Sequence, residues 1–208
     1  MSLTVYGVPL SPYVRKLRLC LAEKGLAYQL EIVLPFDQPA WFRELNPLGR
    51  IPAIKDGDFT LADSSVICQY IEEKYHDLIQ FLGQNAEQRA KVRWLEKYSD
   101  YELAPLTTFT IFQHRIINPS MKKPCDEDVV QLALNEKLPV HFDYLEQSLG
   151  NAEYFVGDSL SLADLAFASQ MINMEHAGEQ LDEQRWPSLA ALFARIKARP
   201  SMQGVLQG

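Results

Sequence analysis

Cysteine is scarce in this sequence, and the cysteines present lie far apart. Cys20, Cys68 and Cys125 are odd in number and include no C-x-x-C pair. This spacing argues against a disulfide framework, a zinc site and a thioredoxin-type dithiol centre. We therefore expect a reducing, cytoplasmic location, with Cys20 and Cys68 as small core residues, since free cysteine is usually buried.

The sequence also lacks long apolar runs and an excess of positive charge. No stretch of about 18 uninterrupted apolar residues occurs, so no membrane span is expected, and the first residues, MSLTVYGV, do not resemble a signal peptide. Lys and Arg number 20 against 27 Asp and Glu, which argues against a nucleic-acid partner. The 208 residues, 47% of them hydrophobic, suffice for one large or two small domains.

Residues 1–80 alternate between strand and helix patterns. The short β-branched run at 3–7 predicts a strand, and Ser11, followed by proline, predicts the start of a helix that ends near Gly25. Residues 27–34 predict a second strand, parallel to the first. Two short strands, AIK and FTL, then flank an Asp-Gly hairpin signal and precede a second capped helix, opened by Asp63 and Ser64. This βαβ-ββα order predicts a small mixed sheet covered by helices.

Residues 81–86 are predicted to be a linker, and residues 87–208 read as an α-helical bundle. Pro105 and Pro139 fall inside the helical patterns and are expected to kink or break them. The fold class is therefore α/β followed by all-α.

Two further signals punctuate this helical half. Ser161 and Asp164 have the spacing of a capping box before an apolar run. Pro200 is expected to stop the last helix. No internal repeat or low-complexity segment is apparent.

Ser11 has two interpretations. It is an ordinary helix N-cap, or it also lies beside an anion site, because ligands of α/β sheets bind between strand ends and helix starts. Arg15, Lys16 and Arg18 crowd the same helix and would favour an anion there, although solvated cations are the usual case. Ser64 opens a second helix start that could face the same cleft.

The segment NPLGRIPAI, residues 46–54, places a proline at the start of a predicted strand. Proline cannot donate to a sheet ladder. Two interpretations are open. Pro52 is a trans proline that marks the edge of a strand, or the backbone of the preceding Ile51 pairs with a ligand and not with a neighbouring strand.

Four segments together resemble the glutathione S-transferase family over nearly the whole chain. LSPYVRKLRLCLAEKGL resembles the first helix with its active-site serine, NPLGRIPAI the cis-proline loop, LADSSVICQYIEEKY the γ-glutamyl segment and FVGDSLSLADLAF the capping motif of the helical domain. The resemblance implies a thioredoxin-like glutathione-binding domain, then a helical domain that lines the electrophile pocket. It also implies a homodimer that uses glutathione as co-substrate and no metal.

The resemblance assigns the thiolate donor to Ser11, with Tyr6 and Tyr13 as competitors. It implies a cis Pro52, with the backbone of Ile51 pairing with the cysteinyl part of glutathione. Asp63 would contact the γ-glutamyl ammonium and Ser64 its carboxylate. Arg50 and Gln38 are candidates for the glycyl carboxylate, although both could be ordinary surface residues.

The second substrate is expected to be an apolar electrophile. Its candidate pocket residues are apolar, aromatic or cationic side chains from both halves of the chain: Leu10, Phe36, Tyr101, Leu106, Phe109, Phe112 and Arg115. An aromatic stripe is more often core, and that alternative stays open. The lack of cysteine in residues 8–14 argues against the cysteine-type branches. A glutathione-dependent peroxidase, isomerase or dehalogenase, and a non-catalytic binding or regulatory protein, remain alternatives.

Overall fold

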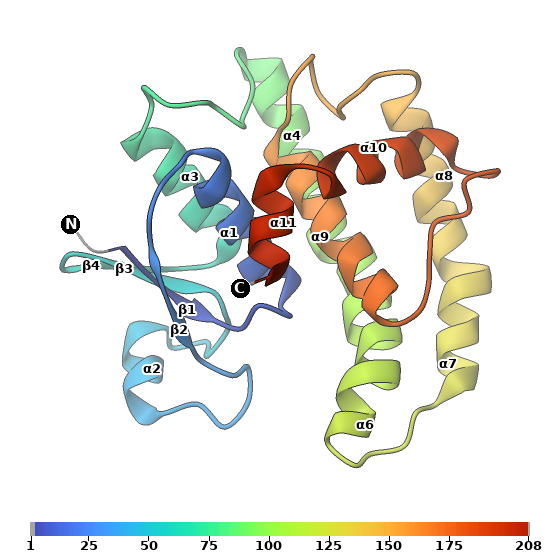
Figure 1. Cartoon of the computed structure of the whole chain (residues 1–208), viewed down its shortest axis with the longest axis horizontal. Coiled ribbons are helices and arrows are strands. Elements are labelled where there is room, and N and C mark those ends of the chain that lie inside the picture. The colour runs from blue at the N-terminus through green and yellow to red at the C-terminus, as the bar shows by residue number, and fades with distance from the viewer. Residues whose placement is uncertain (1–2, 208) are drawn as a thin grey trace. The chain divides into compact units, whose positions relative to one another are not determined.

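The computed structural model describes residues 3–207 and divides into two compact units (Figure 1). The first unit contains the chain up to Phe81 together with the segment from Arg199 onward, and the second contains Leu82–Ala198. The boundary after Phe81 falls at the start of the predicted linker. Assignment of the C-terminal segment to the first unit differs from the predicted division.

A four-stranded sheet with the order β2-β1-β3-β4 forms the first unit (Figure 1). Its strands are β1 (Leu3–Gly7), β2 (Gln29–Ile32), β3 (Ala53–Asp56) and β4 (Phe59–Ala62). β1 pairs in parallel with β2 and antiparallel with β3, and β3 pairs antiparallel with β4. The predicted mixed sheet is confirmed. β2, a largely exposed edge strand, is shorter than predicted.

Two helices cover one face of this sheet and one short helix lies on the other (Figure 1). α1 (Pro12–Glu23) and α3 (Ser64–Lys74) pack together. α2 (Ala40–Leu45) inserts Phe42 into a core cluster with Tyr6 on the opposite face. α2 was not predicted, because it is short and follows Pro39 without a side-chain cap.

The C-terminal helix α11 (Pro200–Gln207) packs against α1 and belongs to the first unit. Met202 and Val205 are buried. Arg199 forms a two-pronged ion pair with Glu23, with Nε–Oε1 and Nη2–Oε2 distances of 2.6 and 2.7 Å. α10 (Pro187–Lys197) ends before Pro200, as predicted, but it is not the last helix, because α11 begins at Pro200.

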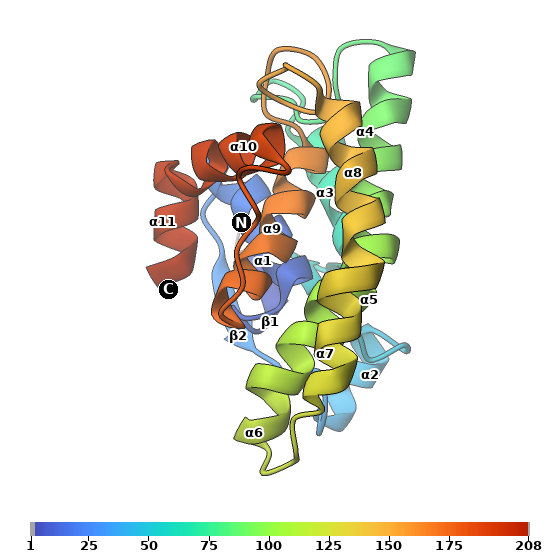
Figure 2. The same ribbon diagram turned by 90° about the vertical axis from the view of Figure 1, so that its right-hand side faces the viewer.

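Two long helical rods lie side by side in the second unit (Figure 2). One runs through α4 (Ala86–Tyr98), a π-helical segment (Ser99–Leu103), α5 (Ala104–Leu106), a second π-helical segment (Thr107–Ile117) and α6 (Asn118–Ser120). The other runs through α7 (Glu127–Leu132), a third π-helical segment (Ala133–Lys137) and α8 (Leu138–Leu149).

The prolines change the type of helix locally and do not end it. Pro105 lies between two π-helical segments, and Pro139 is the second residue of α8, which follows the third. A proline removes one backbone donor, and a local π-type pattern accommodates that loss. The predicted breaks at Pro105 and Pro139 are therefore not seen.

α9 (Leu162–His176) is the central helix of the second unit, and it contacts α4, the Thr107–Ile117 segment and α10. The predicted capping box is confirmed: Asp164 Oδ2 accepts from Ser161 N–H at 2.7 Å and from Ser161 Oγ–H at 2.6 Å. Among residues 3–207, no helix has the length and apolar character that spanning a membrane requires.

Candidate functional site

The sheet register brings three predicted site segments to one end of the first unit. Tyr6 lies opposite Ala53, and Ala53 lies opposite Ala62. The chain leaving β1 toward Ser11, the Ile51–Pro52 peptide entering β3 and the Asp63 turn leaving β4 therefore meet at the same edge. Antiparallel pairing of β3 with both neighbours produces this meeting of strand ends.

The segments also touch through small and buried groups. A Cβ added to Gly7 would lie 2.4 Å from Val14 Cγ2 and 3.4 Å from Ile51 Cβ, so glycine allows α1 and Ile51 to approach each other. Lys16 Nζ donates to Ser65 Oγ at 3.1 Å in a buried contact. The starts of α1 and α3 are therefore held together.

Ser11 caps α1 and is half-buried. Its Oγ accepts from Val14 N–H at 3.4 Å, and its own N–H donates to the Val8 carbonyl at 3.0 Å. Capping uses an oxygen lone pair, so the hydroxyl proton remains able to donate. The predicted N-cap is confirmed, and the hydroxyl lies at the positive end of a helix dipole.

The three cations on α1 are buried, so the usual expectation that they are solvated is wrong. Arg15, Lys16 and Arg18 are 1%, 1% and 5% exposed. Arg15 Nη2 donates to the carbonyls of the two residues before Ser11 at 3.3 and 3.5 Å. Burial, reinforced by the neighbouring Arg18 charge, lowers the pKa of Arg15 to about 9. It is therefore still a cation at neutral pH and adds positive potential beside Ser11.

Tyr6 is 7% exposed, and its ring packs edge-on against Trp41 and Phe42 at centroid distances of 5.5 and 6.4 Å. Burial and the nearby Glu31 carboxylate raise the pKa of its phenol. Tyr13 is half-buried on the first turn of α1. Tyr6 therefore occupies the core on the α2 side of the sheet.

The Ile51–Pro52 peptide is cis, which confirms the predicted isomer. Pro52 is buried and Ile51 half-buried. The preceding loop is held by Asn46, a buried residue to which the sequence analysis gave no role. An asparagine before proline in a loop is a signal for side-chain bonding to nearby backbone, and it could have found this residue.

Asp63 forms the turn between β4 and α3 with φ of 75°. Its Oδ1 accepts from Ser65 N–H at 2.9 Å and from Val66 N–H at 3.2 Å. A positive φ at a residue other than glycine is uncommon and is concentrated at functional sites. Asp63 is exposed, whereas Ser64 is 5% exposed on the first turn of α3.

The side chains of Gln38 and Arg50, the two candidates for the glycyl carboxylate, have different surroundings. Gln38 Nε2 donates to the Gly49 carbonyl at 2.6 Å, so this side chain holds the loop. The Arg50 side chain is exposed, while its backbone carbonyl is held by Asn46.

Comparison with known proteins agrees with this geometry. Residues 5–90 match the family model for the glutathione S-transferase N-terminal domain, and residues 112–207 match the model for the C-terminal domain. Glutathione S-transferase F10 from Arabidopsis thaliana is 33% identical over 171 residues, which cover 80% of this chain and 78% of that protein. The chain belongs to the glutathione S-transferase family.

Solved glutathione transferases share the fold. A glutathione S-transferase from Rhodospirillum rubrum F11 superposes with a TM-score of 0.89 at 28% identity, covering 99% of this chain and 92% of that one. Glutathione transferase F7 from Populus trichocarpa gives 0.85 at 27% identity, covering 99% and 98%. The predicted fold class, a thioredoxin-like domain followed by a helical domain, is confirmed.

The predicted electrophile residues have different surroundings. In the first unit, Leu10 and Phe36 are 45% and 44% exposed; in the second, Tyr101 and Phe109 are 64% and 57% exposed and Leu106 is half-buried. Phe112 is 4% exposed, in keeping with the core alternative.

Arg115, the remaining candidate, joins three segments of the helical unit. It pairs with Glu127 on α7 and with Glu179 after α9, both at 2.5 Å. Its Nη1 also donates to the Ala177 carbonyl at 3.1 Å. These contacts show a structural role for Arg115.

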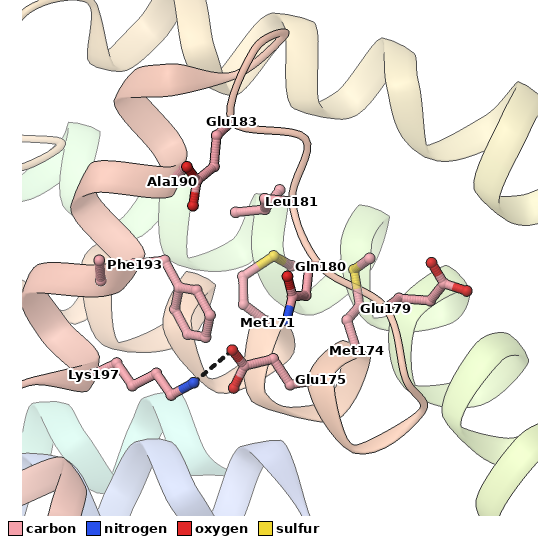
Figure 3. Close-up of a pocket in the computed structure, with 11 residues that line it drawn as sticks. Met171, Met174, Glu175, Glu179, Gln180, Leu181, Glu183, Ala190, Phe193 and Lys197 are labelled. Atoms are coloured by element: carbon pink, nitrogen blue, oxygen red, sulfur yellow. Dashed lines mark hydrogen bonds and ion pairs between the residues drawn. The ribbon is translucent and has the colours of Figure 1, made fainter.

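A cavity of about 200 Å³ in the second unit contains none of the predicted site residues (Figure 3). It lies between α9, α10 and the connecting loop, where Phe193 of α10 faces Met171 of α9, and the Lys197–Glu175 ion pair of 2.6 Å closes one side. Within residues 3–207, no cluster of His, Cys, Asp and Glu is arranged to hold a metal ion.

Proposed function

We propose that this chain is a glutathione transferase in which Ser11 holds the thiol of glutathione as a thiolate for attack on a small apolar electrophile. The observation that carries the proposal is the sheet register. It brings the Ser11 helix start, the Ile51–Pro52 peptide and the Asp63–Ser64 helix start to one end of the sheet. Family membership supports the same chemistry.

The chemical task is to lower the pKa of a thiol. A free thiol with a pKa near ~8.5 is only a few per cent ionised at neutral pH, whereas the thiolate is the nucleophile. Lowering the pKa by ~2 units requires ~2.7 kcal/mol of additional stabilisation of the anion. A hydrogen bond from the Ser11 hydroxyl, the N-terminus of α1 and the buried Arg15 cation together supply stabilisation of that order.

Ser11 acts as a donor and not as a covalent nucleophile. The sulfur attacks the electrophilic carbon, a carbon–sulfur bond forms, and a leaving group such as a halide departs with the bonding electrons. The thiol proton has already passed to solvent. Because the Tyr6 phenol is packed in the core and its pKa is raised, Ser11 is preferred over Tyr6 as the thiolate donor.

The remaining groups bind the ends of the tripeptide. The Asp63 carboxylate contacts the γ-glutamyl ammonium through the oxygen that does not cap α3. Ser64, on the first turn of α3, contacts the γ-glutamyl carboxylate. Arg50 and Gln38 serve the glycyl carboxylate, and the backbone of Ile51 pairs with the cysteinyl residue.

For the electrophile, the exposed side chains among the candidates are the better assignments: Leu10, Phe36, Tyr101 and Phe109. Phe112 and Arg115 are expected to contribute through packing and ion pairs. We also propose that the protein is a cytoplasmic homodimer, as the family resemblance implies. Light scattering after size-exclusion chromatography tests the dimer.

Two experiments test the function. Retention on immobilised glutathione, with elution by free glutathione, separates a binder from a protein that has only the fold. Conjugation of glutathione to an activated aryl halide then separates a transferase from a passive binder. A tripeptide whose thiol is replaced by methyl is the matched control, because it should compete for binding and give no product. Oxidation of glutathione by a hydroperoxide without conjugation would indicate the peroxidase alternative.

A further inference from the structure

Asn46 holds the loop that leads into the cis peptide. It is 3% exposed, and its backbone N–H donates to the Phe42 carbonyl at 2.8 Å. Its carbonyl accepts from Gly49 N–H at 2.9 Å, and its side-chain Oδ1 accepts from Leu48 N–H at 3.1 Å. These three bonds close the turn after α2 and leave the side-chain amide nitrogen for one further partner.

That partner is the Arg50 carbonyl, to which Asn46 Nδ2 donates at 2.6 Å. The Arg50–Ile51 peptide is trans, because Ile51–Pro52 is the one cis peptide within residues 3–207. In a planar trans peptide the C=O and the following N–H point in opposite directions. Since the Arg50 carbonyl is held toward the buried Asn46 amide, the Ile51 N–H points away from the interior of the loop.

A second amide side chain supports the same loop. Gln38 Nε2 holds the carbonyl of Gly49, so two consecutive carbonyls before Ile51 are fixed by side chains. Within the part of the chain that the structure describes, the Ile51 N–H donates to no group. The loop thus presents one oriented backbone donor at the end of the sheet where the proposed site lies.

We propose that Asn46 is a positioning residue of the glutathione site: by holding the Arg50 carbonyl, it aims the Ile51 N–H at the cysteinyl carbonyl of the tripeptide. The inference rests on the proposed function. A donor oriented before binding avoids the entropic cost of ordering it on binding. The peptide backbone of glutathione is held alike in the ground state and the transition state, so loss of this orientation should raise KM and leave kcat nearly unchanged.

Asn46→Asp is the sharpest variant. It keeps the shape and the acceptor for Leu48 N–H, but it sets a carboxylate oxygen against the Arg50 carbonyl. We expect the KM for glutathione to rise about tenfold, the effect of losing one well-aligned hydrogen bond. We expect kcat and the KM for the electrophile to change by less than about twofold. Asn46→Ser should behave alike, because serine can cap Leu48 N–H but cannot reach Arg50.

Tyr70→Phe is the control for a loss of stability alone. It removes the 2.8 Å bond to Asp56, at the opposite end of β3 from Pro52. If Asn46→Asp lowers the melting temperature as Tyr70→Phe does, yet keeps the KM of the unmodified protein, Asn46 is only structural and the inference is wrong.

Measurements on the unmodified protein separate this inference from the proposed function. If calorimetry detects no binding of glutathione, the proposed function fails and the inference fails with it. If glutathione binds, it should slow hydrogen exchange at the Ile51 amide. An exchange rate that does not change overturns the inference even if neither Asn46 variant folds.

Discussion

Replacement of Ser11 by alanine should have little effect on protein stability and a large effect on the pKa of the bound thiol. The cap that this removes is weak, because the distance from Val14 N to Ser11 Oγ is 3.4 Å, longer than the usual ~2.9–3.0 Å. We expect a stability loss near the lower limit for N-caps, about 0.5 kcal/mol, and a fall in melting temperature of about 1–2 °C.

The expected effect on the bound thiol is larger. A hydrogen bond to a charged group contributes about 1.5–3 kcal/mol, which corresponds to a rise of about 1–2 units in the pKa of the bound thiol. From a bound pKa near ~6.5, the thiolate fraction at neutral pH, and with it the conjugation rate, should then fall about 3- to 25-fold. Absorbance of the thiolate, followed against pH with glutathione saturating, measures this directly.

Two controls sharpen the result. Ser11→Thr keeps a hydroxyl and a capping oxygen and should retain most of the activity. Tyr6→Phe should leave the pKa of the bound thiol unchanged, since Tyr6 is packed against Trp41 and Phe42. If Ser11→Ala shows the pKa and rate of the unmodified protein, the donor is another group and the reasoning about the helix start is refuted.

Three further predictions concern binding, pH and packing. Asp63→Asn keeps an oxygen for the α3 cap but removes the charge. Calorimetry should therefore show at least tenfold weaker glutathione binding, with little change in protein stability. An affinity equal to that of the unmodified protein would reject the γ-glutamyl assignment. Burial raises the pKa of Asp164 from its ordinary 3.8 to about 6, so between these values the folded state binds the extra proton. The free energy of unfolding should therefore fall by roughly 3 kcal/mol as the pH rises from about 3 to about 7. Denaturant titrations should show this component missing in Asp164→Asn, and identical profiles would contradict it. Phe112→Ala should lower the free energy of unfolding by about 3–5 kcal/mol in the same titrations. Tyr101→Ala, at an exposed position, should lower it far less and instead raise the KM for the electrophile. The reverse pattern would place Phe112 in the pocket.

Local signals in the sequence were sufficient for the elements that begin or end at a capping residue. Ser11 and Asp63 mark helix starts, and the Ser161–Asp164 box marks another; all three caps are formed. Each depends on residues within one helical turn, so a pattern of a few residues identifies it.

Features that depend on distant residues could not be predicted in this way. α11 belongs to the first unit because Arg199 pairs with Glu23, 176 positions earlier in the chain. α2 has no side-chain cap, and its one buried residue, Phe42, packs with Tyr6 of β1 and Ala53 of β3. Helical periodicity did not distinguish core from surface in the aromatic stripe, in which Phe112 is buried and Tyr101 exposed.

The candidate site shows the same division. The resemblance supplied Ser11, Pro52 and Asp63 from short motifs, and the register of the sheet brings their segments to one edge. The burial of Arg15 could not be predicted from spacing, because a charged residue on a helix face is usually solvated. The Asn-Pro pair could have marked Asn46 as a loop residue, but its hydrogen bond to the Arg50 carbonyl depends on side-chain geometry that a motif does not encode.

A crystal structure of the protein with glutathione tests the central claim most directly. The account predicts the sulfur within hydrogen-bonding distance of Ser11 Oγ, the cysteinyl backbone paired with Ile51 and the γ-glutamyl end at Asp63 and Ser64. A tripeptide bound elsewhere, or a sulfur held by a tyrosine hydroxyl with Ser11 out of contact, would contradict it.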